Sequence, residues 1–121
     1  MKIRIHANSV RFRLSKSEVG TLENEGYLEE TTDFGPTQFG YAIQKSTDNE
    51  LNARFENNKI ILGFPANLLA GWTANNTVGF EANMPLGDGN SLYLLIEKDF
   101  KCLDNAHEDQ SDNYDNPNQT C

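Results

Sequence analysis

Apolar and polar residues alternate from the start of the chain, and this pattern predicts a β-hairpin. Ile3 and Ile5 share one face, and after a polar turn the alternation resumes at Val10. A period of two residues is typical of half-buried strands. Segment 15–18 reads Ser-Lys-Ser-Glu, which is the form of a capping box, and Gly26 supplies a stop signal. We therefore expect two strands and then a short helix before Gly26.

Two further strands are expected after this helix, and the same order of elements then returns fifty residues on. Residues 27–34 and a segment around Tyr41 have strand patterns, and Gly35-Pro36 separates them as a turn. The second half can be aligned with the first at a shift of fifty residues without a gap. This alignment places Ile60 on Val10, Leu62 on Phe12, Phe64 on Leu14, Leu69 on Val19, Trp72 on Leu22, Val78 on Leu28, Phe80 on Glu30, Ala82 on Thr32 and Met84 on Phe34. Each half, 1–45 and 51–99, is therefore expected to form a ββαββ unit.

The two units are expected to share one hydrophobic core, because about 50 residues are marginal for independent folding. Pseudo-duplicated ββαββ units predict an α+β fold with one mostly antiparallel, partly closed, β-barrel-like sheet and two short helices. An open antiparallel sheet with both helices on one face is the alternative. Residues 1–100 would form this single domain. Residues 101–121 form an acidic polar tail, expected either to be disordered or to lie against the basic start of the chain.

The chain has 121 residues and is acidic overall, with a formal net charge of −8. General attraction to nucleic acid or to an anionic membrane is therefore disfavoured. The charge is uneven, since residues 1–16 hold five Lys or Arg and no acid, whereas residues 102–121 hold five acids and no Lys or Arg. No apolar run approaches the roughly 20 residues that span a bilayer, and a strand pattern stands where a signal peptide would begin. A cytoplasmic location is expected.

Three segments resemble a family of small, uncharacterised bacterial proteins. They are 2–19, which opens Lys-Ile-Arg-Ile-His, the Glu-Glu-Thr-Thr-Asp-Phe-Gly of 29–35, and the Glu-Lys-Asp-Phe-Lys-Cys-Leu of 97–103. The resemblance covers nearly the whole chain. It implies a bacterial, cytosolic, stand-alone domain, and such a family has no established activity to carry over.

Residues 1–20 also resemble, more faintly, the strand-turn-strand opening of swapped-hairpin transcription regulators. In those proteins a basic strand face meets DNA. The basic residues of the first hairpin fit this likeness. The matching positions of the second half keep only Arg54 and otherwise hold Asn52, Glu56, Ile61 and Gly63. This difference argues against a symmetric DNA-binding surface.

A ligand site is expected where the basic hairpin approaches Glu30. Arg4, Arg11 and Arg13 lie on one face of the first two strands, while Glu30 is in phase with inward-facing residues and takes the place of Phe80. A carboxylate that is turned inward needs a partner or a raised pKa, and ligand sites arise in this way. Alternatively, the basic face is solvated or neutralises the acidic tail, and Glu30 lies at a bulge or a strand end open to water.

The tail supplies the only cluster with soft metal ligands, which are Cys102, His107 and Cys121. Zinc requires four ligands in a tetrahedron, and a neighbouring acid or histidine could supply the fourth. The spacing matches no strong zinc pattern. A Cys102–Cys121 disulfide and two free thiols are the alternatives. No other metal or cofactor is expected.

These observations favour a binding or protein-interaction module with an unknown protein or small-molecule partner, no membrane, and a monomeric or homodimeric state. The chain holds no Gly-x-Ser-x-Gly, phosphate loop, dinucleotide fingerprint or metalloprotease helix, so no catalytic residue is nominated and an enzyme is disfavoured. Two alternatives stay open. They are zinc binding through the tail, and a regulator that binds nucleic acid through the basic hairpin, although nucleic acid is the less expected partner.

Overall fold

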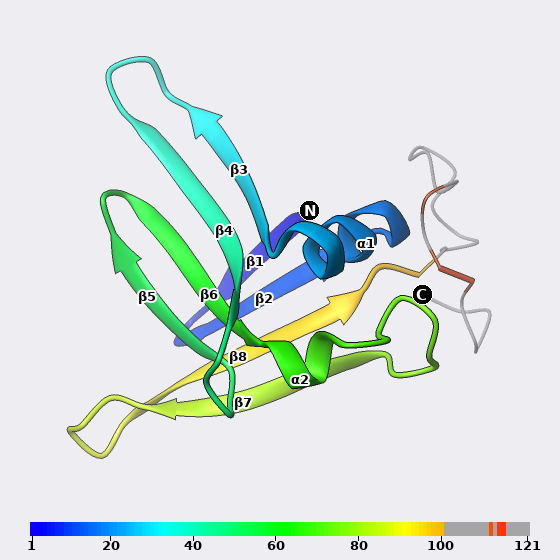
Figure 1. The fold of residues 1–121 in the computed structure, drawn as a ribbon. Helices are drawn as coiled ribbons and strands as arrows, with labels where there is room; N and C mark the ends of the chain where they lie inside the picture. Colours follow the sequence, from blue (N-terminus) through cyan, green and yellow to red (C-terminus); the bar gives the residue numbers. More distant parts are fainter. Residues whose placement is uncertain (101–111, 113, 116–121) are drawn as a thin grey trace.

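Over the residues that the computed structural model describes, which are 1–100, 112, 114 and 115, the chain forms eight strands and two helices (Figure 1). The elements, in chain order, are β1 Lys2–His6, β2 Ser9–Leu14, α1 Lys16–Glu25, β3 Tyr27–Asp33, β4 Gln38–Ser46, β5 Asn52–Glu56, β6 Lys59–Pro65, α2 Ala66–Leu69, β7 Gly79–Pro85 and β8 Ser91–Lys98. The order ββαββ-ββαββ that the apolar pattern predicts is therefore present.

The strands form two four-stranded sheets, with the orders β1-β2-β8-β7 and β3-β4-β6-β5. The four hairpins are antiparallel, whereas the central pairs β2–β8 and β4–β6 are parallel. The expectation of one partly closed, barrel-like sheet is wrong, because no strand pairing joins the two sheets within the described residues. The physical reason is that each hairpin pairs with a hairpin from the other half. The sheets then meet through side chains alone.

The two halves have matching strand orders and registers. Exchanging the first four strands for the last four converts one sheet order into the other. In the first sheet Ser9 lies opposite Tyr93, and in the second Lys59, which is fifty residues after Ser9, lies opposite Gly40. Tyr93 and Gly40 therefore hold equivalent places. The expected similarity of the halves extends to how their strands pair.

The same registers correct the ungapped alignment of the halves beyond α2. Since Glu97 and Gln44 hold equivalent places, their antiparallel partners Gly79 and Tyr27 are equivalent too. The next inward-facing pair along these strands is Phe80 with Leu28, so Glu30 corresponds to Ala82 and not to Phe80. The chain between α2 and β7 is longer than the chain between α1 and β3, and this moves the alignment of β7 with β3 by two residues. Because two is an even number, the same faces of the strands stay apolar.

The first helix begins and ends as its sequence predicts. Ser15 is the N-cap, and the reciprocal hydrogen bonds with Glu18 complete the capping box. Gly26 ends the helix with a φ of 79°, a left-handed conformation that favours glycine. The second helix is shorter than expected, since Pro65 offers no side-chain cap. Trp72 therefore lies in the turn after α2, where its Nε1 donates to the Thr77 carbonyl at 2.8 Å.

The core lies between the two sheets, toward the helices. Its largest fully buried side chains are Trp72, Phe12, Phe64, Leu14, Leu22, Ile43, Leu62, Leu69, Leu94 and Ile96. The rings of Phe64, Trp72 and Phe80 form a cluster with centroid distances of 5.3–5.5 Å. Burial of large aromatic side chains supplies much of the hydrophobic stabilisation of a small domain.

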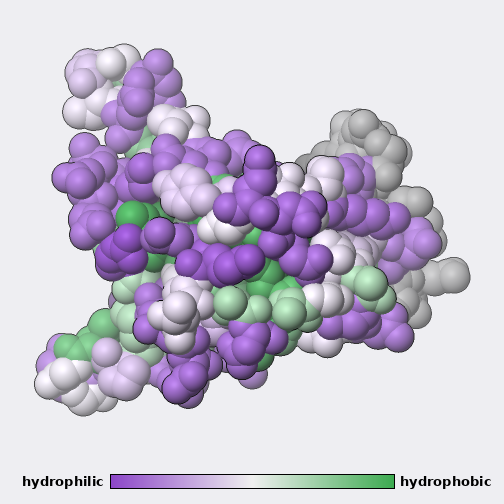
Figure 2. Space-filling view, in the orientation of Figure 1, coloured by the Kyte–Doolittle hydropathy of each residue, from purple (hydrophilic) through white to green (hydrophobic). Residues whose placement is uncertain are grey.

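The hairpin turns point away from the helices, and there the two sheets diverge (Figure 1). Large apolar side chains are exposed near these turns: Ile5, Phe34, Phe55 and Leu86. Figure 2 shows apolar residues at the left, where the hairpins of the two sheets diverge, whereas most of the visible surface is hydrophilic. In the described part of the chain, neither helix has the length and apolar character that crossing a membrane would need.

Candidate functional site

The outward-facing side chains of β1 and β2 form a basic surface on the first sheet, which we call the basic face: Lys2, Arg4, His6, Arg11 and Arg13. The alternation of the strands turns Ile3 and Phe12 toward the core and these residues away from it. In the antiparallel register Arg4 lies directly opposite Arg11, and Lys2 lies directly opposite Arg13. The structure thus brings together the three arginines that the sequence nominates.

One carboxylate, that of Glu97, serves two of these arginines. Its Oε1 accepts from Arg11 Nη2 at 2.8 Å and from Arg13 Nε at 2.8 Å. Glu97 reaches both because β8 runs parallel beside β2 and places it opposite Arg13. Arg4 forms no ion pair among the described residues. Arg11 Nε is buried and has no hydrogen-bond partner in that part of the chain.

A hollow of about 390 Å³ lies over this part of the sheet. Its lining residues are Arg4, His6, Ser9, Arg11, Tyr93 and Leu95. A second hollow of about 270 Å³ adjoins it and shares Arg4 and Arg11. The Tyr93 hydroxyl donates to the Glu81 carboxylate, and this hydrogen bond raises the pKa of Tyr93. Tyr93 is therefore neutral at physiological pH.

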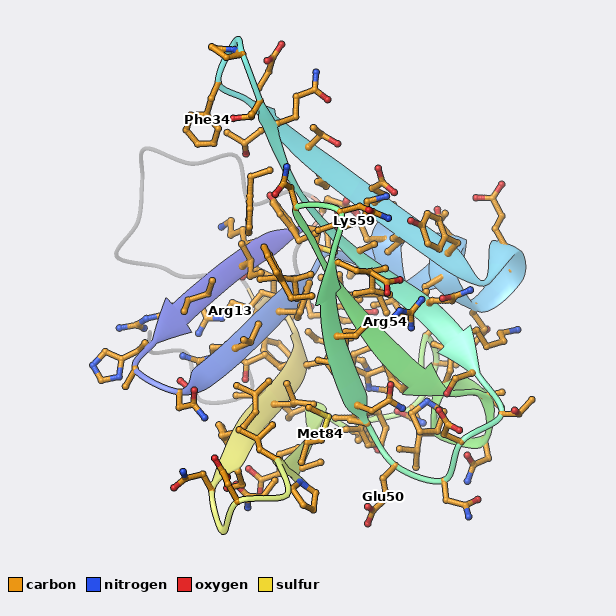
Figure 3. The ribbon with its side chains drawn as sticks, turned by 90° about the vertical axis from the view of Figure 1, so that its left-hand side faces the viewer. Arg13, Phe34, Glu50, Arg54, Lys59 and Met84 are labelled. Atoms are coloured by element: carbon orange, nitrogen blue, oxygen red, sulfur yellow. The ribbon has the colours of Figure 1, made fainter. Side chains whose placement is uncertain are left out.

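The equivalent surface of the second sheet is not basic. Arg54, the counterpart of Arg4, lies opposite Ile61, and its Nε donates to Glu56 at 2.9 Å. Asn52 lies opposite Gly63 in the place that Lys2 and Arg13 occupy on the first sheet. Figure 3 shows Arg13 on the first sheet and Arg54 on the second. The basic face therefore belongs to the first hairpin alone.

The structure does not bring Glu30 to the basic face. Glu30 lies on β3, in the second sheet, opposite Tyr41 and on the side that faces the core. Its Oε1 is 3.5 Å from the Met1 amino group, which also contacts Glu18. The Glu30 side chain is 48% exposed. Among the described residues, the cation that pairs with Glu30 is thus an amino group, where the sequence suggests a guanidinium.

The metal ligands proposed from the sequence, Cys102, His107 and Cys121, lie outside the described residues. Within the described residues, no cluster of three or more His, Cys, Asp or Glu side chains is placed to hold a metal ion.

Sequence reasoning missed Lys98, although it is in phase with the buried Leu94 and Ile96. Lys98 is 3% exposed, and its Nζ donates to the Asn75 carbonyl at 2.7 Å. The same Nζ lies 5.6 Å from the ring centroid of Trp72 and 4.8 Å from that of Tyr114. Burial lowers the pKa of Lys98. The alternation of buried and exposed residues along β8 would therefore have been enough to identify Lys98 as a buried cation.

Part of the acidic tail packs at the helix end of the molecule. Asp112 Oδ2 accepts from Ser17 Oγ at 2.6 Å, and the Asp112 carbonyl accepts from the Lys16 amide at 3.0 Å, at the start of α1. Hydrogen bonding from Ser17 lowers the pKa of Asp112. The Phe100 and Tyr114 rings are 5.8 Å apart. These described tail residues contact α1 and the core.

Neither a curated protein nor a solved structure matches this chain. The resemblance to an uncharacterised small-protein family is confirmed, since a family model matches residues 1–118. The chain belongs to that family, which is a family of unknown function, DUF7009.

Proposed function

We propose that this protein is a binding module whose basic face receives an anionic group of its partner. The observation that carries the proposal is the direct opposition of two like charges, Arg4 and Arg11. In the neighbouring pair, Lys2 is balanced by Asp99 and Arg13 by Glu97. Like charges directly opposite each other on a sheet are destabilising. An anion bound between them would turn this repulsion into attraction.

The local charge supports the same conclusion. Arg11 and Arg13 share one carboxylate, Glu97, and Arg4 forms no ion pair among the described residues, so this patch is positive on a protein whose net charge is −8. A localised positive patch steers an anionic partner to one place. Because the rest of the protein repels a long polyanion, a short anionic segment or a small anionic group suits the basic face better than duplex nucleic acid does.

A fluorescence-polarisation titration tests the proposal. The probe is a fluorescein-labelled decapeptide of glutamate, titrated with the full chain at low and at high salt. We expect salt-sensitive binding that Arg4→Gln and Arg11→Gln each weaken, because each removes one guanidinium donor. Arg54→Gln is the matched control, since Arg54 holds the equivalent place on the second sheet. Equal binding by all four proteins would refute the proposal.

A duplex DNA with the same label tests the alternative of a nucleic-acid-binding regulator. We expect the DNA to bind less tightly than the decapeptide at the same salt concentration. Tighter binding of DNA that falls steeply with salt and is lost in Arg11→Gln would replace our proposal with that alternative.

We also infer that the two halves arose by tandem duplication. The support is the exchange symmetry of the strand orders and the equal registers of β1–β2 and β5–β6, in which Lys2 pairs with Arg13 and Asn52 with Gly63. The test is to align the first half with the second across other members of the family. Apolar positions that fail to coincide in those members would contradict a common origin.

A further inference from the structure

The hollow over β1, β2 and β8 has a cationic side and an apolar side. Cross-strand order places His6, Ser9 and Tyr93 in one row of the sheet, and Arg4, Arg11 and Leu95 in the next. The guanidinium groups and the imidazole therefore stand on the β1 and β2 side, while the Tyr93 ring and Leu95 stand on β8. A ligand with an anionic head and an apolar body would match this arrangement.

We propose that this hollow binds the phosphate group of a small organic phosphate monoester. The inference rests on the proposed function, because it names the anionic group that the basic face receives. The organic part of the ester would pack against Tyr93 and Leu95 on β8.

The charge balance favours a dianion. On β1 and β2, three arginines, Arg4, Arg11 and Arg13, are balanced by one carboxylate, Glu97, which leaves a surplus of two positive charges on this side of the hollow. The Glu81 carboxylate lies on β7, on the far side of Leu95, where it accepts from Tyr93. A phosphate monoester carries about −1.5 to −2 charges at pH 7, whereas a carboxylate carries one. A bound phosphate monoester would neutralise the surplus.

The available donors favour a phosphate as well. Arg4 has no ion pair among the described residues, so its guanidinium is available to a ligand. The Arg11 guanidinium uses Nη2 for Glu97 and leaves Nε buried without a partner in that part of the chain. A buried donor without a partner is unfavourable, and a turn of the guanidinium toward a bound anion would relieve it. Guanidinium forks match the geometry of phosphate oxygens.

The size and the lining of the hollow admit an organic ligand. A volume of about 390 Å³ falls within the range of small-molecule pockets. Tyr93 holds its hydroxyl on Glu81, which keeps the ring neutral and leaves its face as an apolar wall beside Leu95. Inorganic phosphate would leave this wall unused.

Isothermal titration calorimetry of the full chain tests the inference with three probes, which are phenyl phosphate, inorganic phosphate and benzenesulfonate. We expect phenyl phosphate to bind most tightly, because it alone combines a dianionic phosphate with an aromatic body. Arg4→Gln and Arg11→Gln should each weaken phenyl phosphate binding at least about tenfold, the loss expected for one charge-assisted hydrogen bond. Arg54→Gln should bind phenyl phosphate as the unmodified chain does.

The outcomes separate this inference from the proposed function. If the glutamate decapeptide binds through Arg4 and Arg11 but phenyl phosphate does not bind, only the phosphate inference is overturned. Equal binding of inorganic phosphate and phenyl phosphate would overturn the role of Tyr93 and Leu95, and equal binding of benzenesulfonate would overturn the preference for a dianion. If neither the glutamate decapeptide nor phenyl phosphate binds, both the proposed function and the phosphate inference fail. Thermal unfolding of Arg4→Gln checks the fold, which this exposed substitution should not disturb.

Discussion

Lys45 and Lys98 hold equivalent places in the two halves, and both donate a hydrogen bond to a backbone carbonyl. In the parallel pairs Lys98 lies opposite Leu14 and Lys45 lies opposite Phe64, which is the counterpart of Leu14. Lys45 Nζ donates to Glu23 in the last turn of α1 at 3.3 Å, and Lys98 Nζ donates to Asn75 after α2 at 2.7 Å. Lys45 is exposed, whereas Lys98 is 3% exposed.

Burial makes Lys98 a source of pH-dependent stability. Because the pKa of Lys98 is lowered in the folded chain, the unfolded chain binds more protons between that lowered value and the ordinary value of 10.5. Stability contributed by Lys98 therefore rises with pH across this alkaline window. We therefore expect the unfolding free energy of the unmodified chain to increase relative to that of Lys98→Met as the pH rises through this window.

Urea denaturation of both proteins from neutral pH to the ordinary lysine value measures this difference. Lys45→Met, which replaces the exposed lysine at the equivalent place, is the matched control for the loss of a lysine side chain. A difference that stays constant with pH would show that burial does not perturb Lys98.

Replacing Arg4 with a glutamate should stabilise the fold while it removes anion binding. Arg4→Glu converts the opposed like charges of Arg4 and Arg11 into an ion pair, and a cross-strand pair of opposite charges contributes roughly 0.2–1 kcal/mol. Urea denaturation should show a higher unfolding free energy. Arg54→Glu, beside Glu56 on the second sheet, should show no gain. A stability loss in Arg4→Glu would mean that the opposed arginines do not repel each other.

Glu97 competes with any ligand for Arg11 and Arg13. Glu97→Gln should destabilise the fold by about 1 kcal/mol, because it weakens two hydrogen bonds from guanidinium groups to a carboxylate that is 13% exposed. The same substitution should raise the affinity for phenyl phosphate in calorimetry, since it weakens the hydrogen bond that holds Arg11 Nη2 and removes one negative charge from the site. An unchanged or lower affinity would contradict a phosphate site at this place.

Two glycines should respond in opposite directions to substitution by alanine. A Cβ at Gly79 would lie 2.4 Å from the Ile96 carbonyl oxygen, so Gly79→Ala must push β7 from β8 and destabilise the fold. Gly20 lies inside α1 with nothing within 4 Å of an added Cβ, and Gly20→Ala should stabilise by about 0.5–1 kcal/mol. Thermal unfolding measures both changes. Stabilisation by Gly79→Ala would contradict the close contact of β7 with β8.

Local sequence patterns were sufficient for the hairpins, for α1 and for the inward-facing residues. Alternation alone predicts which side of β1 and β2 is buried, and the Ser15 and Glu18 pair predicts where α1 begins. The basic face could be predicted for the same reason, because Arg4, Arg11 and Arg13 are out of phase with the apolar residues. Such features depend on neighbours a few residues away, and the sequence displays these directly.

The partners of each hairpin could not be predicted in this way. A ββαββ half buries the same apolar side chains whether its hairpins pair with each other or with those of the other half. The choice of β2 beside β8 depends on contacts far apart in the chain, and it decides that Glu97 meets Arg11 and Arg13. The loop after α2 likewise changed the counterpart of Glu30, because a gap of even length leaves the apolar phase unaltered.

The sequence by itself therefore determined the elements, their buried faces and the cationic character of the first hairpin, because side-chain period and charge are local properties. Only the tertiary structure decided that there are two sheets, that Glu30 lies away from the arginines, and that Tyr93 and Leu95 adjoin Arg4 and Arg11. These features result from the exchange of hairpins between the halves, which depends on contacts far apart in the chain and leaves no mark on the local pattern. The two sheets then bury their inner faces against one common core.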